Sequence, residues 1–152
     1  MTDLQGAGIA VTIPADWEGS IRDGRFRPLA SGAVDPTLVH LASFPLPESR
    51  GTFGGGAVEL MTSLDVLMVL LEYGPESAGT PLFAAEGIPR RLDPQAFSPD
   101  GLQAGRPGQS GLQQFFTHRG RAFCLYVVLG SHLDRVDLVA RVNAVLATLE
   151  IE

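Results

Sequence analysis

The stretch Arg121-Ala-Phe-Cys-Leu-Tyr-Val-Val-Leu129 decides the fold of this 152-residue chain. Every residue after the arginine is apolar or aromatic, so a strand over this stretch would bury both of its faces. Alternation places Ala122, Cys124, Tyr126 and Val128 on one face, and Phe123, Leu125, Val127 and Leu129 on the other. We therefore expect residues 121–129 to form the central strand of a sheet that is covered on both sides.

The neighbouring residues 112–117 predict a partner strand, joined to 121–129 through His118-Arg119-Gly120. Gly120 can adopt the positive φ of a turn with a bulge, so the two strands should form a hairpin. Two further strands are predicted at residues 9–13 and 37–44, which are rich in β-branched and apolar residues and are followed by proline.

Residues 64–73 fit two kinds of structure. Thr62 and Asp65 could form a capping pair, which favours a helix. The run that follows, Val66 to Tyr73, is apolar except for Glu72, is only eight residues long and ends at Gly74-Pro75, which favours a buried strand. On length we predict a strand, with the helix as the alternative.

After Gly130-Ser131 the apolar residues change from the period of a strand to that of a helix. Ser131 and Asp134 are typical of a capping box. The apolar positions are Leu133, Val136, Val139, Val142, Leu146 and Leu149. This pattern predicts a C-terminal amphipathic helix of about 17 residues that lies on the sheet.

The composition is that of a globular protein, with 45% hydrophobic and 18% charged residues, and its length suits a single domain over residues 1–152. The net charge is −6 and all 11 basic residues are arginines, which argues against a nucleic-acid-binding protein. The densest basic groups are Arg22, Arg25 and Arg27, and the pair Arg90–Arg91. Either these arginines lie on a solvated face beside carboxylates, or they form an anion site.

The sequence indicates neither a catalytic nor a metal-binding group. Cys124 is the only cysteine, which excludes an intramolecular disulfide and a cysteine-rich zinc site. His118 would lie roughly 10 Å from Cys124 along the hairpin, too far for a nucleophile–base pair. His40, His118 and His132 lack the spacing of a metal motif, so no metal or cofactor is expected.

Apolar runs such as Val66 to Leu71 and residues 122–129 are far shorter than the ~20 residues of a membrane helix. The N-terminus shows no signal peptide. We therefore predict a cytoplasmic protein that does not enter a membrane.

Twelve of the 29 glycines and prolines fall in residues 45–56 and 99–111, which predicts two long loops. Candidate binding residues are Trp17, Phe53, Gly54, Gly55, Gly56 and Arg106. Exposed aromatic residues can anchor a partner, although Trp17 and Phe53 could equally close the end of the core. The glycine run lacks the lysine of a phosphate-binding loop, and its alternative role is that of a flexible connector.

The segment from Gly8 to Trp17, a strand followed by proline and a short turn to tryptophan, resembles the start of PsbP-like domains. The C-terminal third is similar too, with paired strands that turn at Gly120, a central apolar strand and a closing helix. This resemblance implies an α+β fold, a mostly antiparallel sheet covered by helices on both faces (an α-β-α sandwich). It also implies a binding or assembly role, because most members of that superfamily act in this way.

These observations lead to three hypotheses about function. The first is a non-enzymatic binding or assembly module whose protein partner contacts residues 45–56 and 99–111. The alternative is a small-molecule-binding protein or hydrolase with a pocket at the sheet edge. The third is a subunit of a homo-oligomer.

Overall fold

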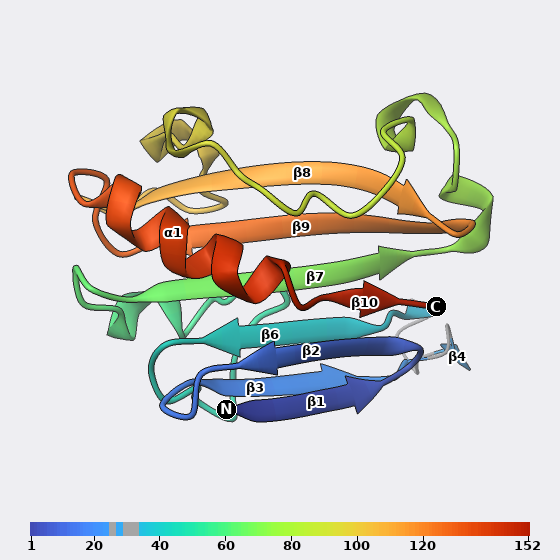
Figure 1. Ribbon diagram of the computed structural model, residues 1–152, viewed down its shortest axis with the longest axis horizontal. Helices are drawn as coiled ribbons and strands as arrows, with labels where there is room; N and C mark the ends of the chain where they lie inside the picture. Colours follow the sequence, from blue (N-terminus) through green and yellow to red (C-terminus); the bar gives the residue numbers. More distant parts are fainter. Residues whose placement is uncertain (25–26, 29–33) are drawn as a thin grey trace.

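A computed structural model describes residues 1–24, 27–28 and 34–152 of the chain (Figure 1). The strands are β1 (Thr2–Gly6), β2 (Ile9–Ile13), β3 (Glu18–Arg22), β4 (Arg27–Pro28), β5 (Val34–Asp35), β6 (Leu38–Ala42), β7 (Val66–Tyr73), β8 (Ser110–His118), β9 (Arg121–Leu129) and β10 (Glu150–Ile151). The helical elements of this part are the α-helix α1 (Arg135–Leu146) and the short 3-10 turns η1 (Val58–Leu60), η2 (Pro75–Ser77), η3 (Pro81–Phe83), η4 (Pro94–Ala96) and η5 (Pro99–Gly101).

Five strands form an antiparallel sheet in the order β3-β6-β7-β9-β8. The stretch 121–129 is β9, which pairs with β8 along its whole length and with β7 over residues 122–129. Its predicted central position is therefore confirmed. The run 66–73 is also a strand, as its length predicted, and not a helix.

One face of this sheet is covered by α1 together with a second, three-stranded antiparallel sheet in the order β1-β2-β10. Figure 1 shows α1 lying across β7 and β9 and leading directly into β10, beside β2. The apolar side chains that meet in this core include Val11, Leu41, Met68, Phe123, Leu125, Val142 and Leu146. The three-stranded sheet thus occupies part of the face on which helices alone were expected.

The opposite face of the five-stranded sheet is covered by irregular chain. Leu67 and Val69 of β7 and Tyr126 of β9 pack there against Phe44 and Val58 from the segment between β6 and β7. Four glycines and two prolines in residues 45–56 oppose helix formation there, and the chain between β6 and β7 contains only the single 3-10 turn η1. The predicted α-β-α sandwich is therefore wrong: among the described residues, α1 covers one face and the fold is mostly β.

The C-terminal helix is shorter than predicted, with 12 residues in place of about 17. Leu133 and Val136 match the apolar period, but their exposed fractions are 90% and 66%, so the pattern extends beyond the buried stripe. The Ser131 hydroxyl accepts a hydrogen bond from the Asp134 N–H at 3.2 Å, and the helix begins only after this turn. Leu149, which was expected in the helix, lies beyond it in the core.

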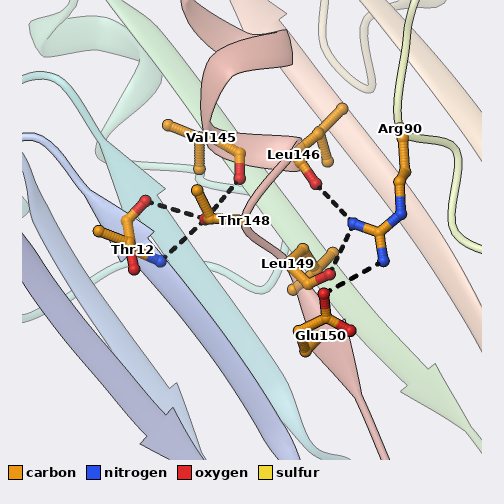
Figure 2. A network of polar contacts seen from close by, with 7 residues as sticks. All are labelled: Thr12, Arg90, Val145, Leu146, Thr148, Leu149 and Glu150. Atoms are coloured by element: carbon orange, nitrogen blue, oxygen red, sulfur yellow. Dashed lines mark hydrogen bonds and ion pairs between the residues drawn. The ribbon is translucent and has the colours of Figure 1, made fainter.

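Side-chain hydrogen bonds fix the point where α1 ends and β10 begins (Figure 2). The Thr148 hydroxyl accepts from the Thr12 N–H at 2.9 Å and lies 2.8 Å from the Val145 carbonyl oxygen. Arg90 donates through one terminal nitrogen to the carbonyl oxygens of Leu146 and Leu149, at 3.1 and 2.8 Å. These bonds add to the backbone bonds from the Thr148 and Leu149 N–H groups to the Val145 and Leu146 carbonyl oxygens.

The hairpin between β8 and β9 closes with a two-residue turn and no bulge. His118 lies directly opposite Arg121, and the residues between them, Arg119 and Gly120, have φ values of 52° and 76°. Positive φ at both positions is typical of a type I′ turn, whose twist matches that of the strands. The hairpin is therefore confirmed, whereas the predicted bulge is wrong.

Candidate functional site

A pocket of about 210 Å³ lies between the two segments that were predicted to form long loops. It is on the face of the five-stranded sheet that irregular chain covers, and Tyr126 of β9 contributes to its lining. The lining residues are Phe53, Gly55, Val58, Glu59, Leu102, Gln103, Ala104, Gln109 and Tyr126. Both predicted loops therefore contribute to one concave site, which we call the loop pocket.

Tyr126 connects the sheet to both loops. Its ring stands edge-on to Phe53, with centroids 5.6 Å apart and an interplanar angle of 87°. Its hydroxyl accepts a hydrogen bond from the Gln103 N–H at 2.8 Å. Burial raises the pKa of Tyr126, so the hydroxyl stays protonated at neutral pH. Its proton has no acceptor among the described residues and can be donated to a ligand.

Gln109 supplies a polar atom that has no partner in the part of the chain that the structure describes. Its side chain is 5% exposed, and its amide nitrogen donates to the Val58 carbonyl oxygen at 2.9 Å. The opposite amide orientation would bring two oxygens together, so this bond fixes which end of the amide faces Val58. The Gln109 Oε1 atom is then buried without a hydrogen bond to any described residue. An unpaired buried acceptor costs about 1–3 kcal/mol, which a donor on a ligand would offset.

The glycine run shapes the wall of the loop pocket. Gly54 and Gly56 have φ values of +86° and +92°, a region that favours glycine. A Cβ atom on Gly54 would lie 2.4 Å from the Leu67 Cδ2 atom of β7, so the backbone approaches the sheet closely there. Gly55 lines the pocket, and a Cβ atom at that position would meet no other atom within 4 Å.

The predicted binding residues separate into those at the loop pocket and those elsewhere. Phe53 and Gly55 line the pocket, and Gly54 and Gly56 flank Gly55 in its wall. Trp17 is 5% exposed in the core on the opposite face, where the Arg141 guanidinium lies 5.8 Å from its ring centroid. Its alternative interpretation as a core residue is therefore confirmed.

Arg106 is half-buried and does not line the loop pocket, and its Nε atom has no partner among the described residues.

Sequence reasoning missed Gln109 and Tyr126. Tyr126 was placed on the correct face of its strand, but nothing in the sequence indicated that loops would leave a hollow above it. Gln109 lay inside a predicted loop, where its type and spacing matched no motif. Its burial depends on the contact with Val58, a residue 51 positions away.

Within residues 1–24, 27–28 and 34–152, no cluster of three metal-ligating side chains occurs. No helix in that part of the chain has the length and apolar character needed to cross a membrane. Comparison of the chain with protein-family models, curated proteins and solved structures finds no match. The resemblance to PsbP-like domains therefore stays a prediction, and the α-β-α sandwich that it implied differs from the mostly β fold of the described residues.

Proposed function

We propose that the protein is a binding protein that holds a small, neutral, planar organic molecule in the loop pocket. The observation that carries this proposal is that Gln109, a residue of the pocket lining, has a buried Oε1 atom with no hydrogen-bond partner among the described residues. Buried acceptors are almost always paired in native proteins, so an exception that lines a concave site is a candidate ligand contact. This proposal keeps the binding role expected from the sequence and takes the small-molecule alternative for the ligand.

The lining defines the chemistry of the ligand. Gln109 Oε1 can accept a hydrogen bond and the Tyr126 hydroxyl can donate one, so the ligand should carry both a donor and an acceptor. Phe53, Val58 and Leu102 supply apolar surface for a ring. Glu59 adds a negative charge, which disfavours an anion. The pocket is smaller than the roughly 300–1,000 Å³ of sites for drug-sized molecules, so one or two rings fill it.

A protein partner that inserts one side chain is the second candidate occupant. Leu60 follows the lining residue Glu59 and is 58% exposed, so apolar surface continues beside the pocket. An apolar side chain of a partner would cover this surface and leave Gln109 Oε1 unpaired, whereas a ring with an N–H group would pair it. Binding of the small molecule thus depends on Gln109, whereas binding of a partner's apolar side chain does not.

A matched pair of probes tests the small-molecule proposal. 2-Pyridone carries an N–H donor beside a carbonyl acceptor, and N-methyl-2-pyridone has a methyl group in place of that donor. We expect 2-pyridone to bind at least about tenfold more tightly, because the site holds an acceptor that only it can satisfy. Amide NMR titration of the wild-type protein measures both affinities and shows whether Phe53, Gln103 and Gln109 are perturbed.

The variant Gln109→Leu should abolish the difference between the two probes. Gln95→Leu is the matched control, because Gln95 is exposed on η4 away from the pocket lining, and it should retain the wild-type preference. Equal binding of the two probes to the wild-type protein, or perturbations confined to other surfaces, would contradict the proposal. Binding of a partner protein that is unaffected by Gln109→Leu would favour the second candidate.

A further inference from the structure

A second pocket, of about 240 Å³, lies at the other end of the segment that carries Phe53. It is lined by Ser20 and Arg22 of β3, Leu38 and His40 of β6, and Glu48 and Arg50 of the segment after β6. None of these residues lines the loop pocket. We call this second site the arginine pocket.

Arg50 reaches into the arginine pocket and donates three hydrogen bonds to neutral acceptors. Its Nε atom donates to His40 Nδ1 at 2.7 Å, and its terminal nitrogens donate to the Pro47 carbonyl oxygen at 2.6 Å and to Ser20 Oγ at 2.8 Å. His40 Nε2 in turn donates to the Thr52 carbonyl oxygen at 2.8 Å, because Nδ1 is occupied as an acceptor. His40 is therefore neutral and adds no charge to the pocket.

Among the described residues, the positive charge of Arg50 has no counter-charge in contact with it. The residue is half-buried, and no carboxylate of the described residues lies within 4 Å of its guanidinium. By contrast, Glu72 pairs with Arg121 at 2.8 Å. Desolvating a charge without a partner is unfavourable, and buried charges in proteins are normally paired. An uncompensated guanidinium at a pocket is a candidate anion-binding group.

Unused hydrogen-bond donors are available beside this charge. An arginine has five N–H groups, and Arg50 uses three for bonds to described residues, which leaves one on each terminal nitrogen. The Ser20 hydroxyl accepts from Arg50 and keeps its own proton for donation. Arg22 also lines the pocket, with a side chain that is 55% exposed.

We propose that the arginine pocket binds a small oxyanion, a carboxylate or phosphate group, through Arg50, Ser20 and Arg22. Guanidinium groups bind both oxyanions through charge-assisted hydrogen bonds. Arg22 lies 3.3 Å from Asp35, and this pair is solvated on the arginine side, so its weak attraction leaves Arg22 able to contact an anion. Glu48 is exposed, so solvent screens its repulsion.

The sequence offered two interpretations of the basic group at 22–27, a solvated face beside carboxylates or an anion site. Arg22 pairs with Asp35, as the first interpretation expects, and it also lines the arginine pocket, as the second requires. Arg25 and the side chain of Arg27 lie outside the described part of the chain. The residue that completes the proposed site, Arg50, is 28 positions away from Arg22 in the sequence and was not part of the predicted group.

Isothermal titration of the full chain with sodium phosphate and with sodium acetate tests this proposal at pH 7.5. Sodium chloride at matched ionic strength is the control for non-specific screening. We expect saturable binding of at least one of the two oxyanions, and the preferred one identifies the group that the pocket recognises. Failure of both phosphate and acetate to bind saturably would overturn the proposal.

Three variants locate the site. Arg50→Lys keeps the charge but loses the planar fork and should weaken binding about tenfold, and Arg22→Gln and Ser20→Ala should each weaken it severalfold. Arg22→Gln and Ser20→Ala leave the Arg50–His40 bond in place, so weaker binding in these two variants does not result from the loss of that bond. Arg119→Gln, in the β8–β9 turn, should bind as the wild type does. Binding that all three pocket variants leave unchanged would place the ion elsewhere and overturn the proposal.

Discussion

Arg121 and Glu72 form a two-point ion pair across the strands β9 and β7, with Nε–Oε2 and Nη2–Oε1 distances of 2.8 Å each. The same guanidinium donates to the Ala7 carbonyl oxygen at 2.9 Å and to the Glu152 carbonyl oxygen at 3.3 Å. Ala7 lies in the turn between β1 and β2, and Glu152 follows β10. One arginine therefore joins the five-stranded sheet to the three-stranded sheet.

Removal of either partner of this pair should destabilise the protein. The Glu72 side chain is 9% exposed and that of Arg121 is 21% exposed, so Arg121→Met leaves a carboxylate buried without its partner. We expect a loss of about 2–4 kcal/mol in the free energy of unfolding, measured by urea denaturation. Glu72→Gln keeps the shape of the side chain and should cost less.

The double variant Glu72→Gln/Arg121→Met is the control for this pair. If the two side chains act through each other, the double variant loses less stability than the sum of the two single variants. Strictly additive losses would show that each residue acts through other contacts.

Stability should decrease as the pH falls below about 6.5, because His40 is held neutral in the folded protein. Burial lowers the pKa of His40 from its ordinary 6.5, and the nearby charges of Arg50 and Arg22 lower it further against the opposing bond to Thr52. The unfolded chain therefore binds a proton at a pH where the folded chain does not. The stabilising contribution is complete above pH 6.5 and is lost as the pH falls towards the folded-state pKa.

The variant His40→Gln should flatten this pH dependence, since an amide can donate to the Thr52 carbonyl and accept from Arg50 without titrating. His118→Gln, at the end of β8, serves as the control and should keep the wild-type slope. Urea denaturation between pH 5 and 8 measures the slopes. An unchanged slope in His40→Gln would assign the effect to another group.

Gly54 and Gly55 should respond differently to the same substitution. Gly54→Ala places a Cβ atom 2.4 Å from the Leu67 Cδ2 atom at a φ of +86°, so we expect a loss of about 1–3 kcal/mol in unfolding free energy. Gly55→Ala adds a methyl group to open space and should change stability by less than about 0.5 kcal/mol. Thermal unfolding of the two variants measures both effects, and equal losses would contradict the described path of the glycine run.

The strands that could be predicted from the sequence are those with a buried face. Residues 9–13 match β2 residue for residue, and the apolar stretches 66–73 and 121–129 match β7 and β9. The strand β1 was missed because its residues Thr2 to Gly6 are mostly polar and exposed, and its pairing is visible only opposite β2. Hydrophobic periodicity thus identifies strands that have a buried face, whereas an exposed edge strand shows little of this pattern.

The prediction that helices cover the second face of the five-stranded sheet was wrong for a related reason. Two apolar faces on β9 require two covers, but the sequence does not specify that both consist of helices. The second cover is built from separate residues such as Phe44, Val58 and Leu102, which share no period. The loop pocket is a product of this irregular cover, and its loops could be predicted from glycine and proline content while its polar contacts could not.

Cys124 should not react with thiol reagents while the protein is folded. The side chain is 1% exposed, and burial raises the pKa of its thiol to about 11. The thiolate, which is the reactive species, is therefore scarce at pH 8 and shielded from solvent. We expect a small aromatic disulfide reagent to label the cysteine only as fast as the protein opens, and rapidly in 8 M urea. Rapid labelling without denaturant would contradict the burial of this residue.

The Tyr126 hydroxyl should hold the second loop on the sheet. Tyr126→Phe removes the acceptor for the Gln103 N–H, so we expect a loss of about 1 kcal/mol in unfolding free energy and faster hydrogen exchange at Gln103. Tyr73→Phe is the matched control, since the Tyr73 ring contacts Phe83 and Phe115 but its hydroxyl has no hydrogen bond to a described residue. Exchange at Gln103 should be unchanged in that variant. The same two variants also test whether the Tyr126 hydroxyl contacts the ligand. If it does, Tyr126→Phe weakens binding of 2-pyridone and Tyr73→Phe does not.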